Sequence, residues 1–327
     1  MKISKERLST VAMQTGFRPE ILEKVIRLMD LLNGIFNDDY LASRLALKGG
    51  TALNLFYFDL PRLSVDIDLN YIGGLDRETM LAEKTVVLST IEKLIAEKDY
   101  QIMRKSEEHA GGKWSLRYQS DLIQQGQIEV DLNFISRANL WPIVKLDSTK
   151  LGNYQATSIP TLEYHDLIGG KLNALFSRHS SRDLFDMYQV FRQFERLDFE
   201  RLRIAFVVYG ATSRKDWRTI SMDQINFEPT ELKNMLLPML RHAELEERKG
   251  IRVWANELMD VCRVNLAKLF PFNPSEVAFL DGIHERGIIQ AELLTQDLSL
   301  INLIRLNPVL LWKCQNVIAF RTKERGV

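Results

Sequence analysis

The sequence predicts an α+β protein in which a unit of helices and strands, over roughly residues 1–160, precedes a mainly helical domain over residues 161–327. Short segments between residues 45 and 134 alternate apolar and polar side chains, which is the period of half-buried strands. After Pro160 the apolar residues follow helical spacing, with helices predicted at Leu162–Ser177 and Arg182–Phe194. A chain of 327 residues with 46% hydrophobic residues is long enough to bury a substantial core.

The first part of the chain combines helical and extended patterns. Residues Pro19–Phe36 place apolar side chains at helical spacing, which predicts a helix. Leu45–Leu47 is a candidate short strand that leads into the glycine pair Gly49–Gly50. We expect a further helix over Ala52–Phe58, after this glycine turn.

Four strands and one long helix are predicted beyond this point. Ser64–Tyr71 is predicted to be a strand, and Arg77–Lys98 is predicted to be a long amphipathic helix. Three successive strands are expected next, at Tyr100–Arg104, Trp114–Ser120 and Gln127–Phe134. Two glycine-containing segments are expected to separate these strands: Gly111–Gly112 and Gln124–Gly126.

Two carboxylates, Asp66 and Asp68, stand in the first of these strands. Alternate side chains of a strand point to opposite faces, so both aspartates share a face with Ser64, away from the apolar side chains. Carboxylates about 7 Å apart along a strand repel each other and are costly to bury. A magnesium ion removes this conflict, because it takes hard oxygen ligands and shares its shell with substrate phosphates. We therefore predict that Asp66 and Asp68 ligate Mg²⁺, or Mn²⁺, although an Asp-x-Asp pair also occurs on ordinary exposed strands.

The glycine pair Gly49–Gly50 indicates a phosphate contact next to these carboxylates. Backbone N–H groups beside glycines at a helix N-terminus can approach phosphate oxygens, and Thr51 offers a hydroxyl donor. The alternative is that the glycines form a simple turn and that Thr51 caps the following helix. Because the glycine turn and the carboxylate strand occur together, we predict that Gly49, Gly50 and Thr51 bind a nucleoside triphosphate.

A third acidic segment, Gln127–Phe134, alternates in the same way. Glu129, Asp131 and Asn133 share one face of the predicted strand. If this strand neighbours the strand of Asp66 and Asp68, Asp131 completes a cluster of three carboxylates, with Glu129 as the second candidate. The alternative is a half-exposed strand whose outer face is simply polar.

Lys171 follows two glycines, Gly169 and Gly170, inside a predicted helix. A glycine at such a position costs about 1 kcal/mol relative to alanine, which indicates that another group approaches the helix closely. That group is either a ligand or a tightly packed helix. Lys171 can meet a phosphate as a point charge, and Arg178 follows about two turns later on the same side of the helix.

Two aspartates come next. Ser180 and Asp183 form a close variant of a capping box, so Asp183 is either a nucleotide-binding residue or part of a helix N-terminus. Asp186, one turn further, is either an active-site carboxylate or the ion-pair partner of Arg182, which lies at the right helical spacing.

The composition limits which binding partners and which cellular compartment are expected. The formal net charge is zero, so no overall field attracts the chain to nucleic acid or to an anionic membrane. The sequence contains no run of about 18 apolar residues, the length of a membrane span, and its charged N-terminus lacks the apolar core of a signal peptide. Two cysteines imply no disulfide framework. We expect a cytoplasmic protein without a membrane partner.

Basic residues that could meet RNA are scattered, and we interpret them as solvated helix faces. They are Arg201, Arg203, Arg214, Lys215, Arg218, Lys313, Arg321, Lys323 and Arg325. Trp217, between two of them, can stack on a base, but a surface anchor is the preferred interpretation.

Four separated motifs resemble, in order, those of the AbiEii/AbiGii-type nucleotidyltransferase toxins, including the MenT-like members. They are the run Lys48-Gly-Gly-Thr-Ala-Leu, the run Arg62-x-Ser-x-Asp-x-Asp-Leu, the strand around Asp131, and the segment from Lys171 to Asp186. The match covers roughly residues 40–190 and is specific, because four motifs agree. It says little about the last hundred residues.

The resemblance implies a DNA polymerase-β-like nucleotidyltransferase core, a small mixed sheet with flanking helices, and a helical C-terminal domain. Asp66 and Asp68 would ligate magnesium, and Lys171 would contact the triphosphate. Asp186 would be the later active-site carboxylate, with Asp183 as the competing choice. The helical domain would in this way contribute Lys171 and Asp186 to the site.

Two further positions follow from the resemblance. In the polymerase-β fold the third carboxylate commonly serves as the general base, but toxins of the family do not all depend on it. Asp131 is therefore either that base or a support for the site. Ser64 matches a hydroxyl position that some antitoxins of the family phosphorylate. In the mechanism that we hypothesise, Lys171 and Arg178 hold the outer phosphates of the NTP.

The function implied is that of a toxin in a toxin–antitoxin or phage-defence system. It would transfer NMP from an NTP to RNA, at the 3′ acceptor end of tRNA, with release of pyrophosphate. Its partners would be the NTP, the RNA acceptor and a cognate antitoxin, and we expect a monomer or weak oligomer. The motifs indicate an NTP as the nucleotide donor and do not identify the molecule that accepts the nucleotide. The rival hypotheses are nucleotidyl transfer to a protein or small molecule, and a non-catalytic nucleotide-binding interaction module.

Overall fold

The structure is a computed structural model that describes residues 3–108, 111–193, 197–242 and 250–324. The chain forms two compact units, each built from separate stretches of sequence. The first unit contains Met1–Arg137, Pro142–Glu163 and Lys233–Lys249. The second contains Ala138–Trp141, Tyr164–Leu232 and Gly250–Val327. The division into continuous domains at residue 160 stays a prediction.

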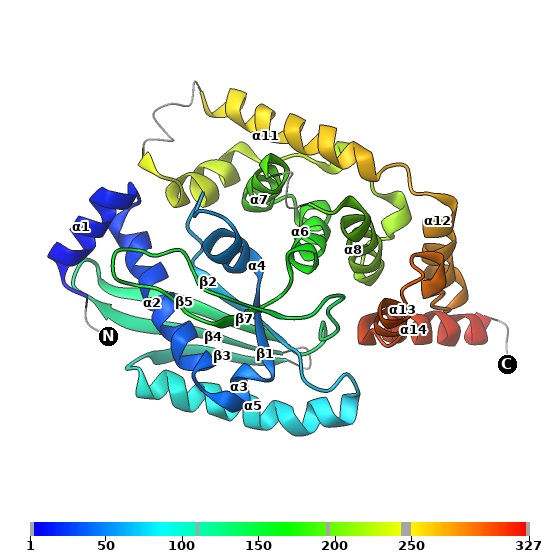
Figure 1. Cartoon of the computed structure of the whole chain (residues 1–327), viewed down its shortest axis with the longest axis horizontal. Helices are drawn as coiled ribbons and strands as arrows, with labels where there is room; N and C mark the ends of the chain where they lie inside the picture. The colour runs from blue at the N-terminus through cyan, green and yellow to red at the C-terminus, as the bar shows by residue number, and fades with distance from the viewer. Residues whose placement is uncertain (1–2, 109–110, 194–196, 243–249, 325–327) are drawn as a thin grey trace. The chain divides into compact units, whose positions relative to one another are not determined.

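Within the described residues, a seven-stranded mixed sheet forms the centre of the first unit (Figure 1). Its order is β3-β4-β5-β2-β1-β7-β6. The pairs β2–β5 and β1–β7 are parallel, and the other neighbours are antiparallel. The strands are β1 (Leu45–Lys48), β2 (Asp66–Tyr71), β3 (Gln101–Glu108), β4 (Gly111–Ser120), β5 (Gln124–Asn133), β6 (Val144–Leu146) and β7 (Ile159–Thr161). The predicted α+β class is confirmed.

Helices of the first unit precede and interrupt this sheet. They are α1 (Lys5–Thr15), α2 (Pro19–Phe36), α3 (Asp39–Ala42), α4 (Gly49–Ala52), its π-helical continuation η1 (Leu53–Tyr57), and α5 (Arg77–Glu97). Helix α2 has the predicted limits, and Pro19 stands at its first turn, where a missing N–H costs nothing. The helix after the glycine turn begins at Gly49, three residues before the predicted start.

One face of the sheet packs against α5 and carries the apolar side chains. The indole Nε1 of Trp114 donates a hydrogen bond to Glu92 of α5, and Trp114 is the cross-strand neighbour of Val130, which is itself paired with Ile67. All three apolar side chains are fully buried. Because side chains alternate along a strand, Asp66 and Asp68 belong to the opposite face.

Two segments that were predicted to separate strands lie inside them. Gly111–Gly112 begins β4, and Gln124–Gly126 begins β5. Gly126 is paired with Tyr118, and a Cβ at Gly126 would lie 2.1 Å from the Tyr118 ring. The glycine therefore makes room for an aromatic side chain within the ladder, and the turn between the two strands falls at residues 121–123.

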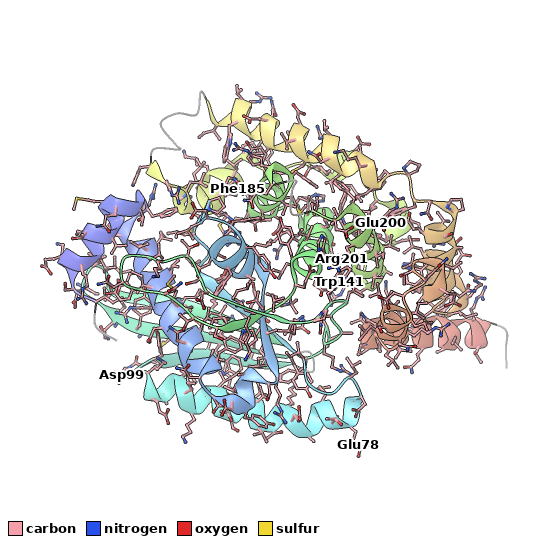
Figure 2. All side chains as sticks on the ribbon, in the orientation of Figure 1. Glu78, Asp99, Trp141, Phe185, Glu200 and Arg201 are labelled. Carbon is pink, nitrogen blue, oxygen red and sulfur yellow. The ribbon has the colours of Figure 1, made fainter. Side chains whose placement is uncertain are left out.

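The second unit is helical. Its main helices are α6 (Tyr164–Arg178), α7 (Ser181–Arg192), α8 (Phe199–Thr212), α11 (Ile251–Leu266), α12 (Pro274–Asp281), α13 (Leu298–Arg305) and α14 (Pro308–Glu324). Helix α6 packs against α7 and α8, and α7 packs against α11. Phe185 of α7, which is labelled in Figure 2, contacts Trp254 of α11, with ring centroids 6.1 Å apart. The predicted end of the second helix, Phe194, lies outside the described residues.

Over the described part of the chain, no helix combines the length and the apolarity that crossing a bilayer requires.

Candidate active site

Strands β1 and β2 place the glycine turn beside Asp68. Lys48, the last residue of β1, is the cross-strand partner of Asp68. The next residue, Gly49, has a left-handed backbone with φ of +75°, and a Cβ there would lie 2.2 Å from Oδ2 of Asp68. Glycine is required here because side chains rarely tolerate this backbone conformation and because the carboxylate occupies the space. The structure thus brings the glycine turn and the carboxylate strand together.

Thr51 fastens the start of β2. Its side chain is fully buried, and its hydroxyl donates a 2.6 Å hydrogen bond to the backbone carbonyl of Asp66. The carbonyl of Gly50 accepts a hydrogen bond from Nδ2 of Asn54 at 2.9 Å. The Thr51 hydrogen bond joins α4 to β2, and the Asn54 hydrogen bond lies within the helical segment α4–η1. Nucleotide binding by Gly49, Gly50 and Thr51 stays a prediction.

The parallel pairing of β2 with β5 gathers the acidic side chains on one face. Asp66 is opposite Glu129, and Asp68 is opposite Asp131. Adjacent strands are about 4.8 Å apart, so Asp131 stands beside the two carboxylates that sequence analysis selected as metal ligands. Ser64 is half-buried in the segment that leads into β2.

Two lysines bracket these carboxylates. The strand registers place Lys48, Asp68, Asp131 and Lys113 in one row across β1, β2, β5 and β4. Lys113 also pairs with Glu129 at 2.7 Å. Neither lysine is among the site residues predicted from the sequence. Lys48 lies within a quoted motif, whereas the position of Lys113 depends on a register that local pattern does not specify.

The pKa of Asp131 lies above the ordinary value of an aspartate. Partial burial raises the pKa of Asp131, the carboxylate of Asp68 raises it further, and the ammonium groups of Lys48 and Lys113 oppose both effects. A carboxylate with a raised pKa binds a proton more readily than an ordinary aspartate, which suits a general base.

The acidic face fits a magnesium ion that is shared with substrate. Its donors are carboxylate oxygens, the hard ligands that Mg²⁺ and Mn²⁺ prefer. In the part of the chain that the structure describes, no group of three or more His, Cys, Asp or Glu side chains is arranged to hold a metal ion. Two carboxylates suit an ion that completes its shell with phosphates and water, and ion binding by Asp66 and Asp68 stays a prediction.

In the second unit, Lys171 lies in a buried ion-pair cluster. Its Nζ is 2.9 Å from Oδ1 of Asp183 and 2.9 Å from Oδ2 of Asp186. The three side chains are 7%, 1% and 0% exposed. Arg178 contacts both carboxylate oxygens of Asp183, at 2.7 and 3.0 Å. Burial alone would raise the pKa of Asp183, but Lys171 and Arg178 outweigh that effect and hold the pKa well below its ordinary value.

The contacts of this cluster bear on the two alternative roles of Asp183. Asp183 lies in the first turn of α7, as the capping-box pattern predicts. The carboxylate of Glu231, however, accepts the backbone N–H of Ser181 at 2.8 Å, and the Ser180 side chain makes no cap hydrogen bond. The carboxylate of Asp183 faces Lys171 and Arg178, so it serves the cluster.

The two glycines before Lys171 have different surroundings. A Cβ at Gly169 would lie 2.4 Å from the Tyr209 ring and 2.9 Å from Cβ of Ala205, both on α8. Gly169 therefore permits the close packing of α6 on α8. A Cβ at Gly170 would meet nothing within 4 Å, and Gly170 is exposed. The sequence left open whether a ligand or a packed helix approaches these glycines. Helix packing explains Gly169 and does not explain Gly170.

The scattered basic residues are mostly engaged within the second unit. Arg203 pairs with Glu276, and Arg218 contacts Asp216, Asp281 and Glu285. The guanidinium of Arg201 lies 5.7 Å from the ring centroid of Trp141 (Figure 2). The side chains of Lys323 and Arg325 lie outside the described residues.

The expectation that Trp217 anchors at the surface is wrong. The side chain is fully buried. It packs edge-on against Phe176 and Phe206, with ring centroids 5.6 and 5.2 Å away. Trp217 is buried because it packs into an aromatic cluster whose members come from other parts of the sequence. The polar residues next to Trp217 in the chain give no sign of this cluster.

Comparison with known proteins agrees with this architecture. The family model described as "Nucleotidyl transferase AbiEii toxin, Type IV TA system" matches residues 30–261. Among solved structures, the chain is similar to MenT4, a nucleotidyltransferase toxin from Mycobacterium tuberculosis H37Rv, with a TM-score of 0.62 and 14% sequence identity. That similarity covers 94% of this chain and 99% of MenT4. No curated protein sequence matches significantly. The predicted nucleotidyltransferase fold is confirmed.

Proposed function

Because the chain belongs to the AbiEii nucleotidyltransferase toxin family of type IV toxin–antitoxin systems, we propose that it transfers NMP from an NTP to the 3′ acceptor end of an RNA, tRNA in particular. Family membership implies an NTP substrate and an antitoxin partner. The proposal adds Mg²⁺ dependence, the RNA acceptor, a cytoplasmic site of action and a monomeric or weakly oligomeric state. The RNA acceptor rests on the resemblance of the four motifs.

One observation carries the proposal: Asp131 stands opposite Asp68 in the parallel β2–β5 pair, with Asp66 on the same face. Pairing between residues that are 63 positions apart in sequence thereby brings Asp66, Asp68 and Asp131 to adjoining positions, with Glu129 opposite Asp66. A non-catalytic module has no need for such an arrangement, since neighbouring like charges disfavour the ionised state.

The chemistry is an in-line displacement at the α-phosphorus. The terminal RNA hydroxyl oxygen forms a bond to the α-phosphorus, the bond from that phosphorus to the bridging oxygen breaks, and pyrophosphate departs with the electron pair. The hydroxyl proton passes to the carboxylate of Asp131. When bound by Asp66 and Asp68, Mg²⁺ would supply charge stabilisation for the phosphates.

The remaining residues are assigned to positioning of the triphosphate. The backbone of Gly49 and Gly50 and the Thr51 segment are proposed to face the triphosphate. Lys171 and Arg178 are proposed to hold its outer phosphates, with Asp186 as the later carboxylate, and Asp183 orients both cations through the contacts described above. Ser64 is proposed as the hydroxyl through which an antitoxin modifies the site.

The test uses the full chain with each of the four NTPs labelled at the α-phosphate, Mg²⁺ and total RNA. We expect label to enter RNA with the wild type and not with Asp66→Asn. Asp99→Asn, on an exposed turn (Figure 2), is the matched control and should retain transfer. Label in RNA with Asp66→Asn would refute the assignment, and label only in protein or in a small molecule would refute the RNA acceptor.

A further inference from the structure

A small polar cavity lies beside Asp131, on the side of the row that faces away from Asp68. It has a volume of about 250 Å³ and is formed by the ends of β3, β4 and β5. Ser106, Lys113, Asp131 and Asn133 contribute polar groups to its lining. This cavity lies wholly within the first unit.

The strand registers explain why these side chains share the cavity. Ser106 of β3 is paired with Lys113 of β4, and Lys113 is paired with Asp131 of β5. Asn133 lies two residues beyond Asp131 and therefore on the same face. Asp131 is thus the boundary residue: the metal carboxylate Asp68 is its neighbour on one side and the cavity on the other.

The lining is polar and locally ordered. The side-chain oxygen of Asn133 accepts the backbone N–H groups of Ile135 and Ser136, each at 2.8 Å, which fixes its carboxamide. A Cβ at Gly111 would lie 1.9 Å from the carbonyl oxygen of Leu132, so the start of β4 must stay without a side chain. These contacts fix the Asn133 carboxamide and require glycine at the start of β4.

Lys113 is a cationic side chain in the cavity lining, and its ammonium group is paired with Glu129 at 2.7 Å. The Glu129 carboxylate raises the pKa of Lys113 by a hydrogen bond, so the ammonium group stays charged at neutral pH. Its side chain is 49% exposed, so a ligand anion can reach it. A cation at the rim of a small polar cavity is suited to a phosphate that adjoins a sugar.

We propose that this cavity receives the 3′-terminal ribose of the RNA acceptor, with Lys113 contacting the phosphodiester that precedes that ribose. The inference rests on the proposed function, in which Asp131 takes the proton of the attacking hydroxyl. The donor nucleotide then lies on the Asp66–Asp68 side and the acceptor on the Lys113 side. The volume is below the roughly 300–1,000 Å³ of sites that enclose a drug-sized ligand, which fits one terminal sugar. A protein hydroxyl would bring no phosphate to Lys113.

The test compares Lys113→Gln with Lys105→Gln. Lys105 belongs to the same β3–β4 pair and has a similar ion pair, 2.6 Å from Glu92, but it lies on the α5 face of the sheet. We expect Lys113→Gln to raise the KM for acceptor RNA about 10-fold and to leave the KM for NTP within about 2-fold, the effect of one phosphate contact. Lys105→Gln should change neither.

Equilibrium binding gives a second readout that does not need turnover. The probe is a fluorescein-labelled oligoribonucleotide with a free 3′ hydroxyl, titrated at several salt concentrations. Loss of one phosphate contact should reduce the slope of log K against log salt by about 0.7 for a single strand. Melting temperatures of the two variants establish that both are folded.

Each outcome decides between the two proposals. If wild type labels RNA but Lys113→Gln has an unchanged RNA KM and salt slope, the cavity assignment is wrong and the proposed function stands. An equal defect in Lys105→Gln, or a defect confined to the NTP, also overturns it. If wild type labels no RNA, the proposed function fails, and equal probe binding by wild type and Lys113→Gln then overturns the inference as well.

Discussion

The carboxylate of Asp68 occupies the space that a side chain at Gly49 would need. A Cβ added at Gly49 would lie 2.2 Å from Oδ2 of Asp68, and the backbone at Gly49 is left-handed. The glycine turn and the carboxylate strand are therefore interdependent parts of one structure. Moving either of them displaces the proposed metal ligand.

Gly49→Ala should abolish transfer and lower stability. The left-handed backbone alone costs a non-glycine residue about 1–3 kcal/mol, and the added methyl group must push Asp68 aside. Nucleotide transfer and urea denaturation of the same preparation measure the two effects. Full activity in Gly49→Ala would show that the position of Asp68 does not matter.

The glycines of α6 should respond in opposite directions to alanine. Gly170→Ala fills open space and gains helix propensity, so it should stabilise the protein by up to about 1 kcal/mol. Gly169→Ala meets Tyr209 and Ala205 and should destabilise it by about 1–3 kcal/mol through overpacking. Chemical denaturation of both variants checks the pair. A stabilised Gly170→Ala with weaker NTP binding would show that substrate approaches the helix there.

Asp131→Asn should stabilise the protein at neutral pH while slowing transfer. The pKa of Asp131 is raised in the folded state, so the folded protein keeps a proton that the unfolded chain loses above about pH 3.9. Stability is therefore lost as the pH rises through the window between the unfolded and the raised folded pKa.

The pH dependence separates this effect from a general change in packing. The melting temperature of Asp131→Asn should exceed that of wild type at pH 7, and the difference should vanish below the ordinary pKa of aspartate. If Asp131 is the base, the wild-type rate rises with pH through its raised pKa and the rise is absent in the variant. A constant difference in melting temperature at every pH would contradict this explanation.

Lys171→Met should destabilise the protein as well as inactivate it. The substitution removes the ammonium group that contacts both Asp183 and Asp186 in a buried cluster. Removing one partner of a buried ion pair costs about 3–5 kcal/mol. Lys113→Met, a half-exposed lysine with one carboxylate partner, should cost about 1 kcal/mol or less.

Comparing the Lys171 and Lys113 variants also separates a structural role of Lys171 in the ion-pair cluster from a role in binding the triphosphate. Urea denaturation gives the stability of each variant, and calorimetric titration with Mg–NTP gives its donor affinity. Wild-type stability with lost NTP affinity would mean that Lys171 acts on the triphosphate and contributes little to the cluster. Lys171→Arg keeps the charge and should retain more stability than Lys171→Met.

The short-range sequence pattern predicted the helices and strands of the site more accurately than it predicted which strands and side chains lie next to them. Helix α2 has the predicted limits, and β2 contains both aspartates within the predicted strand. The segments Gly111–Gly112 and Gln124–Gly126 were misplaced because the role of their glycines depends on the partner strand, as the Tyr118 ring shows for Gly126. Trp217 was misplaced for a related reason: its apolar neighbours are remote in sequence.

The amino-acid order alone determined that Asp66 and Asp68 share a face and that helices follow the sheet, because helical and strand periods act between residues close together in the chain. Only the tertiary structure decided that β5 lies beside β2 with Asp131 opposite Asp68 and Lys113 next in the row. It also decided that two aspartates hold Lys171. Strand register and burial depend on residues that are far apart along the chain, and no local period specifies them.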